Sequence, residues 1–381
     1  MANQPWPTPP IDEILDEREP AANQANVLRQ KRLIEKTLAE LGYDVKIRQV
    51  QQGPRLTRYN VSPESAAHVS KIKNLDQDLA VALSGATVQM AQPTPQNPAL
   101  GILVLHPRRQ QTTVKLRPIL ESAVFRQMGG FLKVGLGLDL VGEPVVIDLT
   151  ELPHLLIGGT TGSGKSTCLH AILASLLCTY SPNALQLLLI DPLAIELRDY
   201  TNLPHLFAPV VTRSAQALDT LNTIDKVIER RYQSFADIQV RNIAGYNQQL
   251  KRSRKQTIPY IVVAIDNVFD LLMTSAKAVE QTITRMAQRA RGAGVHLILS
   301  TPRADTDALS GTLKANFPGR IAFRVTDAAE SRLILDKGGA EELVGQGDML
   351  YKAPNSNLPQ RIQGAYVSEE ERRRIVEFWK S

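Results

Sequence analysis

The sequence predicts an α/β protein in which a mostly parallel sheet, covered by helices, is preceded by a small α+β domain. Three observations favour this class. From about residue 111, short runs rich in β-branched residues and leucine alternate with amphipathic helical patterns, as in parallel sheets buried on both faces. A glycine-rich segment at residues 159–166 stands between one such strand and a helix. Before residue 111, short strands and a few helices alternate without that regularity.

The bulk composition is that of a soluble globular protein. The chain has 381 residues, enough for two or three domains, with 43% hydrophobic and 22% charged residues. No run of about 18 apolar residues and no signal-peptide pattern is present, so we expect a cytoplasmic protein without a membrane segment. Cys168 and Cys178 fall in one predicted helix and are expected to be reduced core residues. The net charge of +6 permits an anionic partner without establishing one.

The first part of the chain divides into a lead-in and a small domain. Residues 1–22 are predicted to be disordered, because prolines recur there without any hydrophobic period. Residues 23–110 form the predicted small α+β domain, which opens with an apolar stripe at helical spacing over residues 25–40. Its other expected elements are strands at 45–50, 56–61, 88–90 and 102–105 and helices at 64–71 and 75–83.

Residues 111–381 form the predicted larger domain. Two strands at 132–140 and 144–149 are expected to form a hairpin, and a charged helix over 369–379 is expected to close the domain. The strands of the parallel sheet are predicted at 155–157, 185–190, 260–265, 296–301 and 320–325.

A phosphate-binding loop is the strongest motif. Residues 159–166 read Gly-Thr-Thr-Gly-Ser-Gly-Lys-Ser and match G-x-x-x-x-G-K-[ST] at every position, after a strand and before a helix. Glycines let backbone N–H groups surround the phosphates of ATP, Lys165 reaches the β and γ oxygens, and Ser166 can bind Mg²⁺. The predicted nucleotide-binding residues are Gly159, Thr160, Thr161, Gly162, Ser163, Gly164, Lys165, Ser166 and Thr167.

A second magnesium ligand is expected at the end of a neighbouring strand. Asp266 closes the run YIVVAID and is the preferred candidate, and Asp191, closing LQLLLID, is the alternative. Both strand ends can face the nucleotide, since ligands of such sheets collect at the carboxyl edge.

Several further runs, in order, resemble the motor segments of the FtsK/SpoIIIE family. They include PHLLIGGTTGSGKST, LLLIDP, PYIVVAID, AQRARGAGVHLILST and GQGDMLY, and VSKIKNLDQDLAVAL resembles the small domain that precedes the family's motor. The resemblance covers about residues 24–370. It implies a RecA-like P-loop NTPase domain and a homo-oligomeric ring, a hexamer, around double-stranded DNA. ATP would drive movement along that DNA in bacterial chromosome partition.

The same resemblance implies roles for basic residues. Arg291 matches the position of the arginine finger, which would reach a neighbour's γ-phosphate and complete a catalytic set with Lys165 and Asp266. Arg303, Lys314 and Arg332 fall in segments that resemble the pore loops that contact DNA. The alternative for each of these residues is an ordinary solvated surface charge.

Four positions depart from the family's pattern, and all concern nucleotide chemistry. Asn267 replaces the expected catalytic Glu, and an amide cannot accept a proton from the attacking water. Leu193, Pro302 and Ala328 replace an expected Lys, Gln and Lys. ATP binding is therefore expected to be intact and hydrolysis doubtful, with Asp270 or Glu196 as possible replacement carboxylates.

Three functions remain open at this point. The first is an ATP-driven DNA translocase, and the second is an ATP-binding ring subunit, weakly hydrolysing or inactive, with a structural or regulatory role on DNA. The third is a secretion ATPase of the type VII kind, which the small domain's resemblance to DNA motors disfavours. No membrane segment ahead of the motor and no winged helix after it is expected, and the chain is also consistent with a piece of a longer protein.

Overall fold

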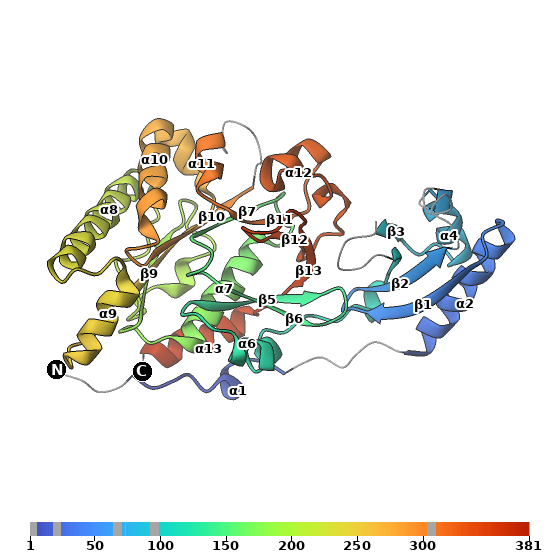
Figure 1. Cartoon of the computed structure of the whole chain (residues 1–381), viewed down its shortest axis with the longest axis horizontal. Coiled ribbons are helices and arrows are strands. Elements are labelled where there is room, and N and C mark those ends of the chain that lie inside the picture. Colours follow the sequence, from blue (N-terminus) through green and yellow to red (C-terminus); the bar gives the residue numbers. More distant parts are fainter. Residues whose placement is uncertain are drawn as a thin grey trace. The chain divides into compact units, whose positions relative to one another are not determined.

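The computed structural model describes residues 6–17, 24–63, 71–72, 74–91, 99–302 and 310–380. The chain divides into two compact units, whose elements are labelled in Figure 1. One unit comprises residues 1–17, 115–136 and 145–381, and we call it the P-loop unit because it contains residues 159–166. The other, the small unit, comprises residues 18–114 and 137–144.

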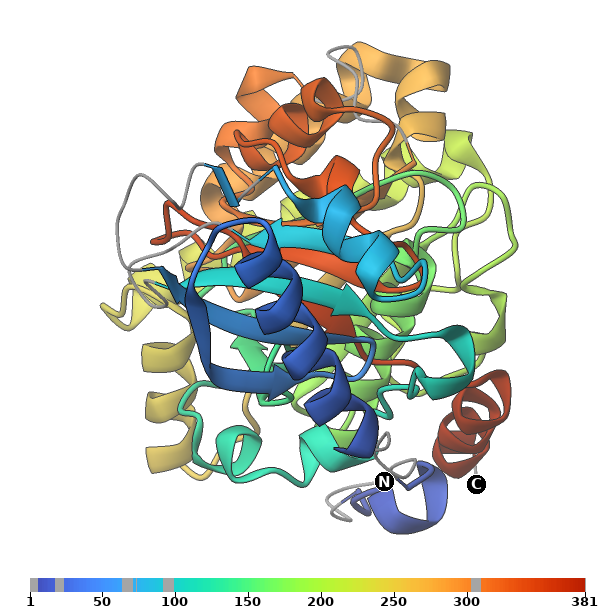
Figure 2. The ribbon, with the colours of Figure 1, turned by 90° about the vertical axis from the view of Figure 1, so that its right-hand side faces the viewer.

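The small unit is a four-stranded antiparallel sheet with helices packed on it. The strand order is β1-β2-β4-β3, and α2 crosses the strands in Figure 2. Apolar residues of α2 such as Ile34 and Leu38 meet Ile47, Tyr59 and Ile102 of the strands in one buried core. The described elements are α2 (Gln24–Glu40), β1 (Val45–Gln52), β2 (Leu56–Pro63), α4 (Asp76–Ala82), β3 (Val88–Ala91) and β4 (Leu100–Leu105). The helix expected at 64–71 falls almost wholly outside the described residues.

The P-loop unit is built on a nine-stranded sheet. Its order among the described strands is β6-β5-β13-β12-β11-β7-β10-β9-β8, and the run from β11 to β8 is parallel. The strands are β5 (Lys133–Asp139), β6 (Pro144–Asp148), β7 (His154–Gly158), β8 (Leu185–Ile190), β9 (Tyr260–Ile265), β10 (Val295–Thr301), β11 (Gly319–Phe323), β12 (Asp348–Lys352) and β13 (Gln360–Gly364). All residues of β7, β9, β10 and β11 are buried, as a sheet covered on both faces requires.

Helices cover both faces of the parallel strands. Figure 1 shows α8, α10 and α12 on one side and α7 and α13 on the other. Helix α7 is buried around almost its whole circumference, since it lies between the sheet and α13. The helices of this unit are α1 (Ile11–Ile14), α5 (Arg117–Leu120), α6 (Ala123–Gln127), α7 (Lys165–Thr179), α8 (Ser214–Asp237), α9 (Ile243–Arg252), α10 (Val268–Ala290), α11 (Gly311–Ala315), α12 (Ala328–Leu335) and α13 (Glu369–Lys380).

The structure differs from the sequence expectation of a disordered lead-in at residues 6–17. These residues form α1 and lie against α13, as Figure 2 shows for the short blue helix beside the red one. Leu15 is 2% exposed, and Arg374 donates to an Asp16 carboxylate oxygen at 2.7 Å. The partners of this segment come from the far end of the chain, so no local periodicity reveals them.

The predicted fold class is confirmed: a largely parallel α/β sheet is preceded by a small antiparallel α+β unit. Cys168 and Cys178 are free and buried in α7, as expected. Within the described ranges, no helix combines the length and the apolar composition needed to cross a bilayer.

Candidate functional site

The phosphate loop joins β7 to α7 in a backbone conformation that requires glycine. Gly159, Gly162 and Gly164 have φ values of +147°, +76° and +124°, which L side chains rarely adopt. A Cβ on Gly164 would lie 2.8 Å from the Gly347 nitrogen, and one on Gly159 would lie 2.7 Å from the Phe323 Cβ. The loop is therefore packed against backbone on its outer side, and only glycine fits at both positions.

Hydrogen bonds hold the loop in place from both sides. The Thr160 N–H donates to the Arg324 carbonyl at 2.9 Å, and the Ser163 hydroxyl donates to the Thr160 carbonyl at 2.6 Å. The Gly347 N–H donates to the Ser163 carbonyl at 3.0 Å. The cradle is therefore formed by protein contacts alone, which lowers the entropy lost when an anion binds.

Lys165, the first residue of α7, points back over the loop. Its Nζ donates to the Thr160 carbonyl at 2.9 Å. Burial lowers the pKa of Lys165, and the negative charges of Asp266 and Glu196 oppose that shift. A buried cation beside backbone donors at a helix N-terminus suits a polyphosphate such as that of ATP.

Asp266 and Asp191, the two candidate magnesium ligands, have different surroundings. Asp266 follows β9 and accepts a hydrogen bond from the Ser300 hydroxyl at 2.7 Å, and burial raises its pKa. Asp191, after β8, accepts backbone hydrogen bonds from Leu193, Glu196 and Leu197 at 3.2, 2.9 and 2.9 Å. Asp191 is thus occupied in shaping a loop, and Asp266 remains the better candidate to bind Mg²⁺ with Ser166.

Asn267 lies directly after Asp266 and begins α10. Its φ of +57° places it in the left-handed region, which Asn tolerates better than most residues. Its side-chain nitrogen donates to an Asp270 carboxylate oxygen at 2.6 Å. Its side-chain oxygen is buried without a hydrogen-bond partner among the described residues.

The other three departures are spread along the same edge. Leu193 is 54% exposed in the loop after β8, and Pro302 follows the last residue of β10. Ala328 begins α12, where the Asp327 carboxylate accepts hydrogen bonds from the Ala329 and Glu330 backbone N–H groups. None of the three positions offers a charged or amide side chain to a nucleotide.

The arginines of α10 and its C-cap divide into two groups. Arg285 and Arg289 donate to the Asp225 carboxylate at 2.8 and 2.7 Å. Arg291 is exposed and only 3.5 Å from the exposed carboxylate of Glu151. Surface pairs at that distance are weak, so Arg291 is held less firmly than Arg285 and Arg289 and remains the candidate finger residue.

The three candidate DNA contacts also differ. Lys314 is largely buried, and its Nζ lies 3.2 Å from one carboxylate oxygen of Asp336, whose other oxygen contacts Arg320 and Lys352. Arg332 is exposed on α12. Arg303 lies outside the described residues. Of the two described positions, Arg332 is the one whose charge faces solvent.

Sequence reasoning missed several residues that shape this site. Gly347, Phe323 and Arg324 contact the phosphate loop but lie far along the chain. His170 contacts Glu196 and is itself contacted by Tyr200, whereas sequence reasoning named Glu196 only as one of two replacement carboxylates. The spacing of Ser166 and His170, four residues apart on one helix, places both on the same face and was a usable signal.

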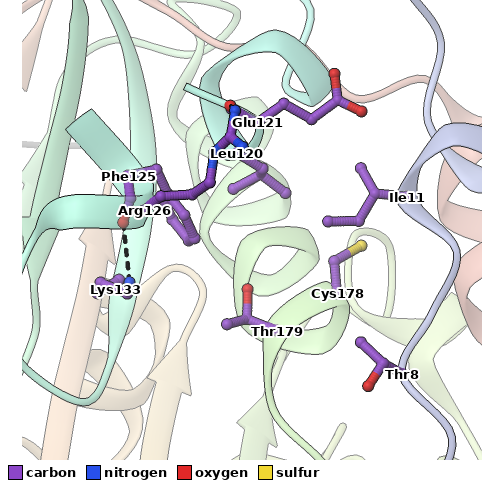
Figure 3. Close-up of a pocket in the computed structure, with 9 residues that line it drawn as sticks. All are labelled: Thr8, Ile11, Leu120, Glu121, Phe125, Arg126, Lys133, Cys178 and Thr179. Atoms are coloured by element: carbon purple, nitrogen blue, oxygen red, sulfur yellow. Dashed lines mark hydrogen bonds between the residues drawn. The ribbon is translucent and has the colours of Figure 1, made fainter. Parts of the chain in front are cut away.

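A separate hollow of about 630 Å³ lies at the opposite end of α7. Figure 3 shows its lining, in which Lys133 donates to the Phe125 carbonyl at 2.9 Å. Cys178 and Thr179 reach it from the end of α7. Since α7 has 15 residues and is thus about 22 Å long, this hollow is distinct from the phosphate loop.

Family models match most of the chain. One described as the FtsK/SpoIIIE family matches residues 115–306, and one described as the FtsK alpha domain matches residues 9–105. The DNA translocase SpoIIIE of Bacillus subtilis (strain 168) is 40% identical over 385 residues, covering 99% of this chain and 49% of that protein. The DNA translocase FtsK of Halalkalibacterium halodurans is 42% identical over 369 residues, covering 93% and 46%. The chain thus spans about half the length of these curated relatives.

Solved structures share the fold. The pCW3 conjugation coupling protein TcpA, in its monomer form with ATPγS, matches with a TM-score of 0.62 and 18% identity, covering 92% of this chain and 99% of that one. The cytoplasmic domain of the type VII secretion ATPase EccC of Thermomonospora curvata matches with a TM-score of 0.56 and 25% identity, covering 65% and 31%.

Proposed function

This chain belongs to the FtsK/SpoIIIE family, and from that premise we propose that it is an ATP-driven double-stranded DNA translocase. In this proposal identical subunits assemble in the cytoplasm into a ring, a hexamer, on duplex DNA. ATP binds at residues 159–167, and Ser166 and Asp266 hold Mg²⁺. When bound, ATP supplies the phosphoanhydride bond whose hydrolysis drives movement.

The observation that carries the proposal is the phosphate loop, which hydrogen bonds with Arg324 and Gly347 hold in place. Lys165 donates to a carbonyl of this loop, and the negative charge of Asp266 acts on Lys165. The residues fit ATP–Mg²⁺, because the cradle excludes any Cβ at two glycines and combines a cation, a hydroxyl and a carboxylate. Arg291, exposed at the C-cap of α10, is the proposed finger that acts on the neighbouring subunit's nucleotide. The relatives' names support DNA as the substrate.

Asn267 favours a second candidate function. A ring subunit that binds ATP and DNA but hydrolyses weakly or not at all would tolerate an amide where the family has a carboxylate. The type VII secretion reading is less supported, because the FtsK alpha domain model matches residues 9–105 ahead of the motor.

ATP turnover with Mg²⁺, with and without long linear duplex DNA, tests the proposal. We expect the unaltered chain to turn over ATP, and we expect duplex DNA to increase the rate. The Asn267→Glu variant should raise turnover further, by up to about 10²-fold, because it restores a carboxylate beside the phosphates. Asn267→Gln is the matched control, since it places equal bulk at the same left-handed backbone without a negative charge.

Different failures have different meanings. Turnover by Asn267→Glu alone, with ATP and DNA binding by every variant, would favour the weakly hydrolysing ring subunit. Absence of duplex binding in gel-shift assays at low salt would reject both DNA-based functions, because phosphate contacts are strongest there.

A further inference from the structure

Glu196 is brought to the start of α7 by a loop that Asp191 shapes. This inference rests on the proposed function, because it concerns the same nucleotide site. Asp191 accepts the Glu196 and Leu197 N–H groups, both at 2.9 Å. These bonds fix the backbone of the loop independently of any ligand, so the position of the Glu196 carboxylate is set in advance.

Two buried side chains then orient the Glu196 carboxylate. His170 Nε2 lies 3.3 Å from Glu196 Oε2, and His170 Nδ1 lies 3.0 Å from the Tyr200 hydroxyl. His170 and Tyr200 are 4% and 0% exposed. Because an ionised carboxylate only accepts hydrogen bonds, His170 Nε2 donates to it and Nδ1 accepts from Tyr200. The hydrogen bonds thus run from Tyr200 through His170 to the Glu196 carboxylate.

The Glu196 carboxylate faces the phosphate site. His170, which contacts it, lies one turn beyond Ser166 on α7, so the carboxylate lies beside the first turns of the helix that follows the phosphate loop. Its side chain is 37% exposed, so one part of the carboxylate remains open to water. Ser166, Lys165 and Asp266 are the residues proposed to hold ATP–Mg²⁺, so Glu196 lies beside the proposed phosphate site.

Asp270 is the other carboxylate near Asn267, and its surroundings are different. The Asn267 amide donates to it at 2.6 Å, and it lies in the first turn of α10. The Asp270 carboxylate is thus already engaged by Asn267, whereas the Glu196 carboxylate is held by His170 and remains partly open to water. Glu196 is therefore the better placed of the two.

We propose that Glu196, positioned by His170 and Tyr200, supplies the carboxylate that Asn267 lacks and orients the water that attacks the γ-phosphate. The water oxygen bonds to phosphorus as the bond to ADP breaks, and the water's proton leaves with inorganic phosphate. Glu196 thus acts as a hydrogen-bond acceptor that fixes the water's direction. His170 and Tyr200 are positioning residues.

The test compares Glu196→Gln with Glu229→Gln, a control on the exposed side of α8. We expect Glu196→Gln to lower ATP turnover about 10²-fold and to keep ATP affinity within about 3-fold. Glu229→Gln should leave both unchanged. Unchanged turnover in Glu196→Gln would overturn the proposal.

A binding readout separates water orientation from a structural role. ADP with beryllium fluoride mimics bound ATP, and ADP with aluminium fluoride mimics the state with water in line. Glu196→Gln should weaken the aluminium fluoride complex about 10-fold more than the beryllium fluoride complex. An equal loss for both would show a general binding role and overturn the proposal.

Variants at His170 test the positioning relay. His170→Phe should give the same selective loss for aluminium fluoride, and His170→Gln should restore most of it because its amide can donate to Glu196. Thermal unfolding shows whether each variant keeps its fold. No selective loss in a folded His170→Phe would remove the relay from the proposal.

The outcome also separates this inference from the proposed function. The unaltered chain could bind ATP and DNA without turning over ATP, while the Asn267→Glu variant does turn it over. That result would overturn the role of Glu196 and leave the ring-subunit function standing. Loss of ATP or DNA binding by the unaltered chain would instead reject the proposed function itself.

Discussion

At Asn267 the left-handed backbone and the amide side chain suit each other. A residue other than Gly, Asn or Asp costs about 1 kcal/mol in that conformation, so Asn267 carries less backbone strain there than a longer side chain would. Because an amide cannot accept a proton, hydrolysis in the proposed function depends on a carboxylate from another part of the chain. In our proposal Glu196 supplies this carboxylate. Its backbone N–H donates to Asp191, which follows β8.

Lys314 and Arg332 show how similar residues acquire different roles. Lys314 forms an ion pair with Asp336. Burial raises the pKa of Asp336, but the combined bonds from Lys352, Lys314 and Arg320 outweigh burial and lower that pKa to about 2. Arg332 lies on the exposed side of α12. The charge of Lys314 is therefore largely neutralised within the chain, and that of Arg332 is not.

The Arg332→Ala variant should weaken duplex binding uniformly across DNA sequences. Losing one phosphate contact should reduce the slope of log affinity against log salt by about 1. Fluorescence anisotropy over a salt series measures this slope. Arg373→Ala, which removes an exposed arginine already paired with Glu370 on α13, is the control. An unchanged slope in Arg332→Ala would remove this residue from the DNA contacts.

On the scale of elements, the turn before β12 supports the phosphate loop. Arg361 donates to Asp348 through Nε and Nη2 at 3.0 and 2.6 Å, and Asp348 also accepts the Val344 N–H at 2.9 Å. This buried pair fixes the turn in which Gly347 holds the Ser163 carbonyl. The hairpin of β12 and β13 thus stabilises a loop that precedes it by nearly 200 residues.

Asp348→Asn should destabilise the P-loop unit by about 3 kcal/mol, because it leaves the buried Arg361 charge without its anionic partner. ATP affinity should fall as well, since the turn that holds Ser163 loosens. Urea unfolding and nucleotide titration measure the two effects. Glu370→Gln breaks the exposed pair with Arg373 and should leave the free energy of unfolding nearly unchanged. Equal losses in the two variants would contradict the supporting role of the turn.

Across the whole molecule, residues from both ends of the chain meet within the P-loop unit. Asp16 contacts Lys115 at 3.1 Å and Arg374 at 2.7 Å, and the rings of Trp6 and Trp379 are 6.0 Å apart. Residues 6–17 thereby pack against α13, and α13 in turn packs against α7. The first described segment thus belongs to the P-loop unit although the small unit follows it in the sequence.

Leu15→Ala tests this arrangement. We expect the unfolding free energy of the P-loop unit to fall by about 2 to 5 kcal/mol, because Leu15 is 2% exposed and its removal leaves a cavity. Leu28→Ala, at a position of α2 that is 62% exposed, should change stability by less than about 0.5 kcal/mol. Hydrogen exchange should localise the Leu15→Ala effect to α13. Exchange in α13 as slow as in the unaltered chain would show that residues 6–17 do not stabilise it.

Features that depend on local order and spacing could be predicted from the sequence alone. The strand, the glycine loop and the helix of the phosphate site are contiguous, and the alternation of apolar strands with helices requires a covered parallel sheet. Asp266 was recognisable for the same reason, since it ends a fully apolar strand. Each of these features depends on neighbours within a few residues along the chain.

Contacts between distant side chains depend on the tertiary structure, because the order of strands in the sheet differs from their order in the sequence. β10 lies between β7 and β9, and β12 follows β11 on the other side. That order brings Ser300 to Asp266, and the fold around it brings Gly347 to Ser163 and Asp336 to Lys314. The surroundings of Glu196 are tertiary as well: its contact with His170, which in turn contacts Tyr200, exists only once α7 packs beside the loop after β8.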